Sequence, residues 1–274
     1  LLYGPPGNGK SSLANGMRDA LGDKIFVPKF LENNGQIISV YDPVVHGLPV
    51  QMDEDSTALR REVGRFDQRF HLVNRPCVIA GGELKLSMLE LIYNETSKIY
   101  QAPLQLKAAG GVFIVDDLGR QVEPPQAMIN RWITPMEANY DILTLASGEK
   151  FSVPFDTLVV FSTNFHPSRL FDQAALRRIQ YKLLIDAPSR EEMLQIYLMT
   201  AKAKKVTLSE DIRVHLFTKK YPTVDDGYAA FHAPFLIDQM RSICEFEGIK
   251  EEFTPEMIDK AWEHLFLDSA DFAH

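Results

Sequence analysis

The chain has 274 residues, 45% of them hydrophobic and 24% charged, which is the composition of a folded globular protein and excludes a wholly disordered chain. Its formal charge is −8 at pH 7, and an acidic surface repels phosphate backbones, so nucleic acid is not expected as a partner. No apolar run approaches the roughly 18 residues that a membrane span needs, and no signal peptide is recognised, so we expect a soluble cytoplasmic protein without membrane association.

The strongest motif lies near the N-terminus, where residues 4–11 read GPPGNGKS and fit the pattern G-x-x-x-x-G-K-[ST] completely. Glycines in this pattern let backbone N–H groups point at phosphate oxygens, and the following helix adds its positive N-terminal dipole. We expect Lys10 to reach the β- and γ-phosphates of ATP and Ser11 to reach Mg²⁺; a chance glycine turn is the alternative. The residues expected at the nucleotide are Gly4, Pro5, Pro6, Gly7, Asn8, Gly9, Lys10, Ser11 and Ser12.

The residues around this motif provide the context that it needs. Leu1-Leu2-Tyr3 reads as the end of a buried strand, and residues 12–21 are helix-forming up to Gly22, which suits a helix stop. Because the strand leads directly into the motif and no initiator methionine is present, we expect the N-terminal part of this domain to be missing from the sequence.

A second motif occupies residues 111–120, where four apolar strand residues end in Asp116-Asp117. Ligands collect at the carboxyl edge of a parallel sheet, and two carboxylates there are typical of a Walker B strand. We expect Asp116 to hold the hydration shell of Mg²⁺ and Asp117 to orient or deprotonate the attacking water. Many ATPases of this kind have Glu at the second position, which is one methylene longer than Asp. A polar strand end that caps the next helix is the alternative.

A third apolar strand, residues 158–161, leads to Asn164, whose amide could hold the same water or the γ-phosphate. Asn is also common in turns for conformational reasons, so this interpretation depends on the first two motifs. The seven histidines show no ligand spacing, and we expect no metal other than magnesium.

Four short apolar runs predict parallel strands, at residues 77–80, 112–115, 158–161 and 179–185. Between the first helix and these runs, residues 24–41 alternate apolar and polar side chains around Asn34-Gly35, which predicts a two-stranded ribbon. Residues 42–74 read as an insertion with a helix-compatible part at residues 56–69.

The last third of the chain is helical in pattern. Ser189 with Glu192 forms a capping box, and Ser209 and Thr254 are further helix-start signals. We therefore predict two domains, an α/β nucleotide-binding core over residues 1–188 and an α-helical subdomain over residues 189–274.

The order of these elements resembles the AAA+ family of ATPases, and within it the MoxR-like branch, over nearly the whole chain. The resemblance is carried by residues 4–11, residues 102–105 with 111–120, Asn164, and a hairpin-like stretch, residues 140–155, that turns at Ser147-Gly148. It implies an α/β P-loop core whose parallel sheet has the strand order 5-1-4-3-2, followed by an α-helical lid. Asn164 then matches the residue called sensor 1.

The resemblance also implies an arginine finger, which acts on the ATP of a neighbouring subunit. Residues 172–179 read DQAALRRI, in which Arg178 matches the finger best and Arg177 second. A fixed guanidinium fork suits the phosphate charge of a transition state; two surface arginines before an edge strand are the alternative. Arg120 matches an arginine that MoxR-like proteins carry after the Walker B acids, and a simple ion pair is its alternative.

The lid departs from the family pattern at the residue called sensor 2, an arginine that related lids place at the start of a helix. This chain has Pro234 at that position. Arg241 lies seven residues further on, roughly 10 Å along a helix, and is a poor substitute.

The motifs and the resemblance predict a Mg²⁺-dependent ATPase of the AAA+ class. The implied assembly is a homo-oligomeric ring, with six subunits expected, that remodels a protein partner whose identity the sequence does not reveal. An alternative, motivated by Asp117 and the absent sensor 2 arginine, is a scaffold that binds ATP in order to assemble and turns it over slowly. A third is a DNA-directed motor of related fold, which the acidic balance disfavours.

Overall fold

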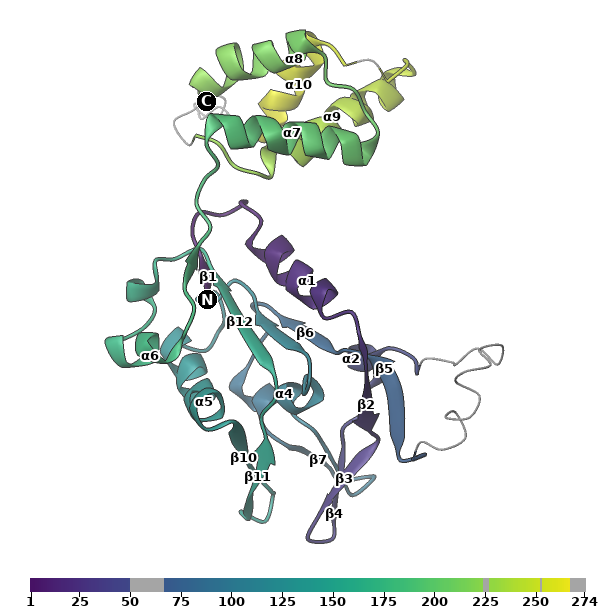
Figure 1. Cartoon of the computed structure of the whole chain (residues 1–274), viewed down its shortest axis with the longest axis vertical. Helices are drawn as coiled ribbons and strands as arrows, with labels where there is room; N and C mark the ends of the chain where they lie inside the picture. Colours follow the sequence, from purple (N-terminus) through teal and green to yellow (C-terminus); the bar gives the residue numbers. More distant parts are fainter. Residues whose placement is uncertain (50–66, 224–226, 252, 267–274) are drawn as a thin grey trace, which may run out of the picture. The chain divides into compact units, whose positions relative to one another are not determined.

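The computed structural model describes residues 1–49, 67–223, 227–251 and 253–266. The chain divides into two compact units (Figure 1). We call the first, Leu1–Tyr3 with Lys10–Leu184, the sheet unit, and the second, Gly4–Gly9 with Ile185–His274, the helical unit. The glycine-rich residues 4–9 therefore group with the helical unit, whereas the residues on either side of them belong to the sheet unit.

A five-stranded parallel sheet lies at the centre of the sheet unit (Figure 1). Its strands in spatial order are β13 (Leu183–Leu184), β1 (Leu2–Tyr3), β12 (Leu158–Thr163), β9 (Val112–Val115) and β6 (Cys77–Ala80). Numbered along the chain, this order is 5-1-4-3-2, which confirms the order that the family resemblance implies. The strand predicted over residues 179–185 is shorter than expected, because only Leu183 and Leu184 pair with β1.

The inner strand β9 forms the buried centre of the sheet. All four residues of β9 are buried, as is usual for an inner strand of a parallel sheet that is covered on both faces. The ring of Trp132, on α5 (Pro125–Ala138), packs against Phe113 and Phe161, with centroids 4.9 and 6.4 Å away. The other helices of this unit are α1 (Lys10–Ala20), α2 (Pro43–His46), α4 (Leu104–Lys107) and α6 (Gln173–Arg178), with 3-10 turns η1 (Leu86–Leu89) and η2 (Pro167–Arg169).

Two predicted hairpins are present in the sheet unit. Strands β10 (Tyr140–Thr144) and β11 (Lys150–Pro154) pair antiparallel, which confirms the hairpin predicted over residues 140–155. Strands β3 (Phe30–Asn33) and β4 (Gln36–Ser39) are joined by Asn34-Gly35, whose φ angles of +49° and +78° are those that a tight Asn-Gly hairpin turn requires.

The ribbon predicted over residues 24–41 is only partly right. Strand β2 (Lys24–Pro28) is not part of the hairpin and pairs with β5 (Phe70–Asn74). Strand β4 pairs on its other side with β8 (Ile99–Gln101), and β8 pairs in turn with β7 (Ile92–Asn94). Pairing between segments this far apart in the chain has no local sequence signal. The helix-compatible part predicted over residues 56–69 lies, up to residue 66, outside the described residues.

The helical unit contains α7 (Arg190–Lys204), α8 (Glu210–His215), α9 (His232–Glu247) and α10 (Pro255–Leu265), with a π-helical turn η3 (Leu216–Lys220) and a 3-10 turn η4 (Tyr221–Thr223). The predicted caps are confirmed, because Ser189, Ser209 and Thr254 each accept a hydrogen bond from the backbone N–H three residues on. The unit has its own apolar core. Among the described residues, no helix has both the length and the hydropathy that crossing a bilayer requires.

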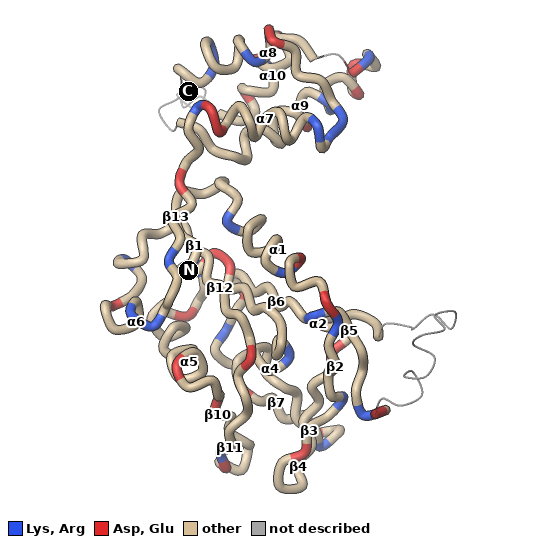
Figure 2. Tube along the Cα trace, viewed as in Figure 1, with Lys and Arg blue, Asp and Glu red and all other residues tan. Residues whose placement is uncertain are grey.

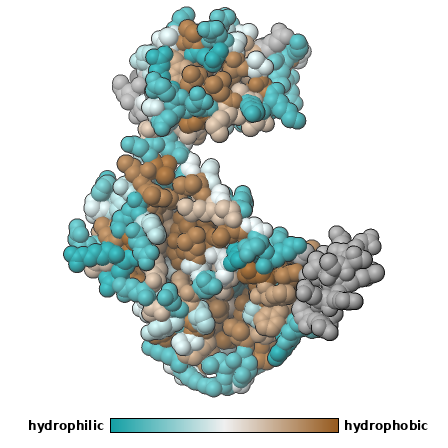
Figure 3. Space-filling model, in the orientation of Figure 1, coloured by the Kyte–Doolittle hydropathy of each residue, from teal (hydrophilic) through white to brown (hydrophobic). Residues whose placement is uncertain are grey.

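The described surface is mixed in charge. Lys and Arg are interspersed with Asp and Glu along the trace of both units, so no continuous basic stretch is seen in the described part of the chain (Figure 2). Apolar residues also reach the visible surface of the sheet unit (Figure 3). At edge strand β13 the exposed side chains are apolar: Leu183 and Leu184 are 46% and 53% exposed, and Tyr181 just before them is 76% exposed.

A buried ion pair fixes the β10–β11 hairpin to helix α5. The guanidinium of Arg131 donates two hydrogen bonds to the Asp141 carboxylate, at 2.7 and 2.9 Å, and its Nε donates to Glu90 at 2.8 Å. Gln105 on α4 donates a further bond to Asp141 at 2.9 Å. Because the Asp141 side chain is only 3% exposed, its charge depends on these partners for compensation.

Replacing Asp141 by Ala should lower the free energy of unfolding of the sheet unit by about 3 kcal/mol, because Arg131 would keep a largely buried charge without its bidentate partner and with only the half-exposed Glu90 beside it. Urea denaturation of the purified variant measures this change. Asp238→Ala is the control, since Asp238 pairs with Lys204 but is 52% exposed, and the effect there should stay within about 0.5 kcal/mol. Equal losses in the two variants would contradict a structural role for the buried pair.

Candidate functional site

The glycine-rich part of the phosphate-binding motif lies in the helical unit and has the backbone that glycine allows. Gly4, Gly7 and Gly9 have φ angles of +140°, +76° and +87°, a region that other residues rarely adopt. A Cβ at Gly4 would lie 2.1 Å from the carbonyl oxygen of Ile185, so no larger residue fits there. Glycines with positive φ between other residues are typical of loops whose backbone N–H groups form an anion-binding concavity.

The last two residues of the motif, Lys10 and Ser11, begin helix α1 in the sheet unit. Lys10 is only 6% exposed. Burial lowers the pKa of Lys10, whereas the negative charges of Asp117 and Asp116 act in the opposite direction. The ammonium group therefore lies within electrostatic reach of both carboxylates that follow β9.

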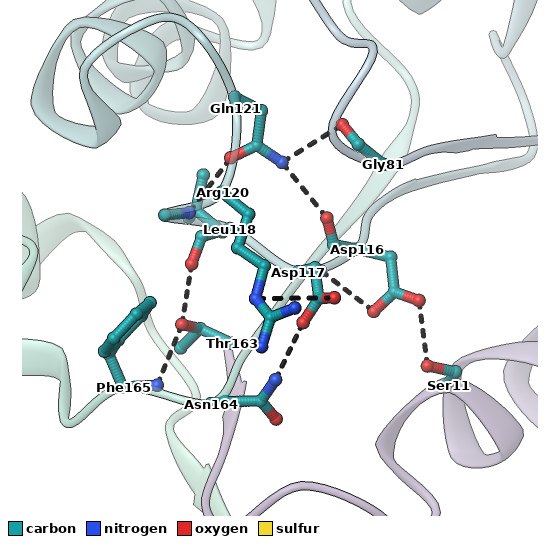
Figure 4. A network of polar contacts seen from close by, with 11 residues as sticks. Ser11, Gly81, Asp116, Asp117, Leu118, Arg120, Gln121, Thr163, Asn164 and Phe165 are labelled. Atoms are coloured by element: carbon teal, nitrogen blue, oxygen red, sulfur yellow. Dashed lines mark hydrogen bonds and ion pairs between the residues drawn. The ribbon is translucent and has the colours of Figure 1, made fainter.

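Ser11, Asp116, Asp117 and Asn164 meet at the carboxyl edge of the sheet (Figure 4). The Ser11 hydroxyl donates to Asp116 Oδ2 at 2.8 Å. Asn164 Nδ2 donates to Asp117 Oδ1 at 2.8 Å, and the Arg120 Nε lies 3.9 Å from Asp117 Oδ2. The structure thus brings together four of the predicted site residues, which come from three separate segments of the chain.

The donor set beside helix α1 fits magnesium in its chemistry. Mg²⁺ binds oxygen ligands and usually keeps several waters, with one or two protein groups and substrate phosphates completing the shell. Ser11 Oγ and Asp116 Oδ2 are two such oxygens, 2.8 Å apart. In the part of the chain that the structure describes, no group of three or more His, Cys, Asp or Glu side chains could hold a metal by itself, so a metal here would rely on phosphate and water.

Gln121 is a site residue that the sequence did not indicate. Its side chain is 9% exposed, its Oε1 accepts from the Gly119 N–H at 2.9 Å, and its Nε2 donates to the carbonyls of Gly81 and Asp116, both at 3.1 Å (Figure 4). Gln121 therefore links the end of β6 to the loop after β9 and holds the backbone of Asp116 in place. A lone Gln in a loop belongs to no motif, and only the folded loop reveals its role.

The backbone of Asp117 is in the left-handed region, with φ at +51°. Asp and Asn tolerate this conformation better than other non-glycine residues, because their short polar side chains can bond locally. Here the Asp117 N–H bonds to the side chain of Asp116 at 3.0 Å. This conformation gives a physical reason for Asp, rather than the longer Glu, as the second acid.

The two arginines proposed from the resemblance lie in the last turn of α6. Arg178 Nε donates to Glu137 at 2.7 Å, and its Nη1 donates to the carbonyl of Ala174 at 3.0 Å. Arg177 is exposed. In the helical unit, Arg241 pairs with Glu251 and donates to the carbonyl of Lys204, so its guanidinium is already engaged.

Comparison with protein families finds one match, to a domain of unknown function (DUF8689) over residues 189–264. No curated protein matches the chain. Similar folds occur among solved structures. NtrX from Brucella abortus in complex with ADP has a TM-score of 0.53 at 13% identity, covering 93% of this chain and 48% of NtrX.

A proline-to-glycine mutant of RuvB from Thermotoga maritima has a TM-score of 0.52 at 14% identity, covering 98% of this chain and 62% of RuvB. An alanine-to-serine mutant of the same protein has a TM-score of 0.51 at 15% identity with the same coverage. The chain thus spans about half to three-fifths of these proteins. The α/β fold with a five-stranded parallel sheet followed by helices is similar to that of RuvB, and at this identity the similarity concerns the fold alone.

Asp117→Glu should lower the free energy of unfolding by about 1 kcal/mol more than Asp117→Asn, since Glu is less compatible with positive φ. Asn retains the side-chain oxygen that accepts the bond from Asn164 and tolerates the same backbone. Urea denaturation of both variants measures the difference. Asp238→Glu, on the exposed side of helix α9, controls for the added methylene and should be near neutral. Equal stability of the Glu and Asn variants at position 117 would contradict backbone selection of Asp.

Proposed function

We propose that this chain is a magnesium-dependent ATPase of the AAA+ class. The single observation that carries the proposal is the meeting of Ser11 with Asp116 and of Asn164 with Asp117, each pair at 2.8 Å, beside a helix that opens with Lys10. A hydroxyl, two acids, an amide and a lysine are the groups that phosphoryl transfer from ATP requires. NtrX, which is similar in fold, was solved in complex with ADP, and this supports a nucleotide as the ligand.

In the proposed mechanism, residues 4–9 bind the phosphates through backbone N–H groups, and Lys10 pairs with the β- and γ-phosphate oxygens. Ser11 and Asp116 would hold Mg²⁺ or its hydration shell, and the metal would neutralise phosphate charge. Asp117 accepts the proton of the attacking water, and Asn164 orients that water or the γ-phosphate. Because Asn164 also donates to Asp117, the amide can hold the carboxylate in place until water is positioned.

We further propose that residues 1–188 and 189–274 act as core and lid of a ring-forming protein, of six subunits, that remodels a protein partner in the cytoplasm. The apolar side chains exposed at edge strand β13 support contact with a second copy, since exposed apolar patches mark interfaces. In this ring Arg178, with Arg177 as second candidate, would act on the ATP of the neighbouring subunit.

A scaffold that binds ATP and turns it over slowly is the second candidate. It is favoured by one specific observation, the engagement of the Asp117 carboxylate by both Asn164 and Arg120. Each contact involves one oxygen of the carboxylate, and hydrogen bonds and a nearby positive charge make a carboxylate a weaker base toward water. Steady-state turnover separates the candidates, because only the motor requires hydrolysis in every cycle.

Asp117→Asn should retain ATP binding and lose hydrolysis on the order of a hundredfold to a thousandfold, because an amide cannot accept the proton of water. ATP affinity is measured by calorimetry and turnover by phosphate release. Lys10→Ala is the matched comparison, in which ATP affinity itself should fall about a hundredfold through loss of a charge-assisted contact. If Lys10→Ala binds ATP normally, or Asp117→Asn hydrolyses it normally, the proposed roles are wrong.

Arg178→Ala should bind ATP normally and hydrolyse it on the order of a thousandfold more slowly, the low end of arginine-finger effects, and Arg177→Ala should be affected less. Glu137→Gln is the control, because it removes only the ion-pair partner of Arg178. Equal losses in Arg178→Ala and Glu137→Gln would indicate that Arg178 acts through that ion pair.

Mixed assemblies test the shared site directly. Rings that combine Arg178→Ala subunits with Asp117→Asn subunits should regain part of the activity, since some interfaces then pair an intact acid with an intact finger. Native mass measurements establish that mixed rings have formed. Mixed rings without activity, or full activity in a strict monomer, would exclude a finger acting between subunits.

A further inference from the structure

The segment Ala230–Phe231, directly before helix α9, is hydrogen-bonded to the glycine-rich loop. The Phe231 N–H donates to the carbonyl oxygen of Gly7 at 2.9 Å, and the Ala230 N–H donates to Asn8 Oδ1 at 3.0 Å. All four residues belong to the helical unit. We call this set of contacts the loop clasp.

The side chain of Phe231 adds an apolar contact to the clasp. A Cβ built on Gly7 would lie 2.3 Å from Phe231 Cδ1, so the ring rests directly on the Gly7 backbone. The ring is 44% exposed and contributes little to the core of the helical unit. Its contact with the loop is therefore separable from the stability of the fold.

The clasp also serves the start of helix α9. The first N–H groups of a helix lack partners within it and are commonly satisfied by a side-chain cap. Helix α9 has no side-chain cap at Phe231, and the N–H of its first residue, His232, is donated to the carbonyl of Ala229. The two acceptors of the loop bind the N–H groups of Ala230 and Phe231, directly before the helix. The geometry of the loop and the start of α9 thus depend on each other.

The chemistry of the clasp leaves the loop able to bind phosphate. The clasp occupies two acceptors of the loop, the Gly7 carbonyl and Asn8 Oδ1, whereas phosphate is bound through backbone N–H donors. Within the described part of the chain, Asn8 Nδ2 is buried and has no hydrogen-bond partner, so a donor on the same side chain is available to an acceptor. Clasp and phosphate therefore do not compete for the same groups.

From this geometry we infer that Phe231 is a positioning residue for nucleotide binding: the loop clasp holds residues 7 and 8 in their phosphate-binding conformation and transmits nucleotide binding to helix α9. The inference rests on the proposed function. A loop that is ordered before the ligand arrives binds it more tightly, because less conformational entropy is lost on binding. Backbone donors and an aromatic ring here form the link between loop and lid helix, in a chain that has Pro234 rather than an arginine at the start of α9.

Coupling of this kind works in both directions. If the clasp favours nucleotide binding, nucleotide must stabilise the clasp by the same factor. The amide hydrogens of Ala230 and Phe231 should then exchange more slowly with solvent when ATP is bound, since both are donated to the loop.

The test compares Phe231→Ala with two matched variants. Phe231→Tyr keeps a ring edge against Gly7, and Phe246→Ala removes a 92% exposed phenylalanine from helix α9. Calorimetry with Mg-ATP should show about fivefold to tenfold weaker affinity for Phe231→Ala and wild-type affinity for the other two. Hydrogen exchange over residues 227–236 should slow on ATP addition in the wild type, in Phe231→Tyr and in Phe246→Ala, and much less in Phe231→Ala.

Wild-type affinity together with a wild-type exchange response in Phe231→Ala would overturn the inference, and so would tighter binding, which would mean that the clasp opposes the nucleotide. Weakened binding in Phe231→Tyr equal to that in Phe231→Ala would also overturn it, since the ring contact would then be irrelevant. The proposed function fails separately, and this inference with it, if the wild type does not bind Mg-ATP or if Lys10→Ala binds it equally well.

Discussion

The parallel alignment of β9 and β12 is the constraint on which the candidate site depends. Both strands end at the same edge of the sheet, so Asp117 and Asn164 come within hydrogen-bonding distance although they are 47 residues apart in the chain. Strand β1 lies on the other side of β12. Helix α1 follows β1 in the chain, and its residue Ser11 donates a hydrogen bond to Asp116. A strand order that moved β12 to an edge would separate these groups, because neighbouring strands lie roughly 5 Å apart.

The two acids are held mainly by neutral hydrogen-bond partners. Gln121 fixes the loop through three bonds to backbone groups, and Asn164 bonds to the carboxylate of Asp117 without cancelling its charge. The left-handed backbone of Asp117 persists because these bonds over-determine the loop. A carboxylate oriented in this way can bind a cation or accept a proton from water, whereas a carboxylate held in a close ion pair is less available for either.

The two proposed functions, an ATP-hydrolysing motor and an ATP-binding scaffold, differ in what happens after ATP is bound. Both need the same loop, the same lysine and the same oxygen ligands, so binding groups do not separate them. The two candidates differ in whether Asp117 accepts a proton from water, and in how the state of the nucleotide would reach the helices. We propose that contacts of Ala230 and Phe231 with the glycine-rich loop carry out that second step, since Arg241 is engaged by Glu251.

The sequence by itself determined the features that depend on neighbouring residues. The positive-φ glycines of residues 4–9, the Asn34-Gly35 turn and the capping residue Ser189 each depend on a few neighbouring positions, so their patterns can be read directly. The strand order of the parallel sheet was also predicted correctly, but from the family resemblance rather than from local patterns. Only the tertiary structure decided which strands complete the second sheet, the role of Gln121, and the pairing of Arg178 with Glu137. These depend on contacts between distant segments, whose partners are selected by packing and by the need to satisfy buried polar groups, and neither leaves a local pattern in the chain.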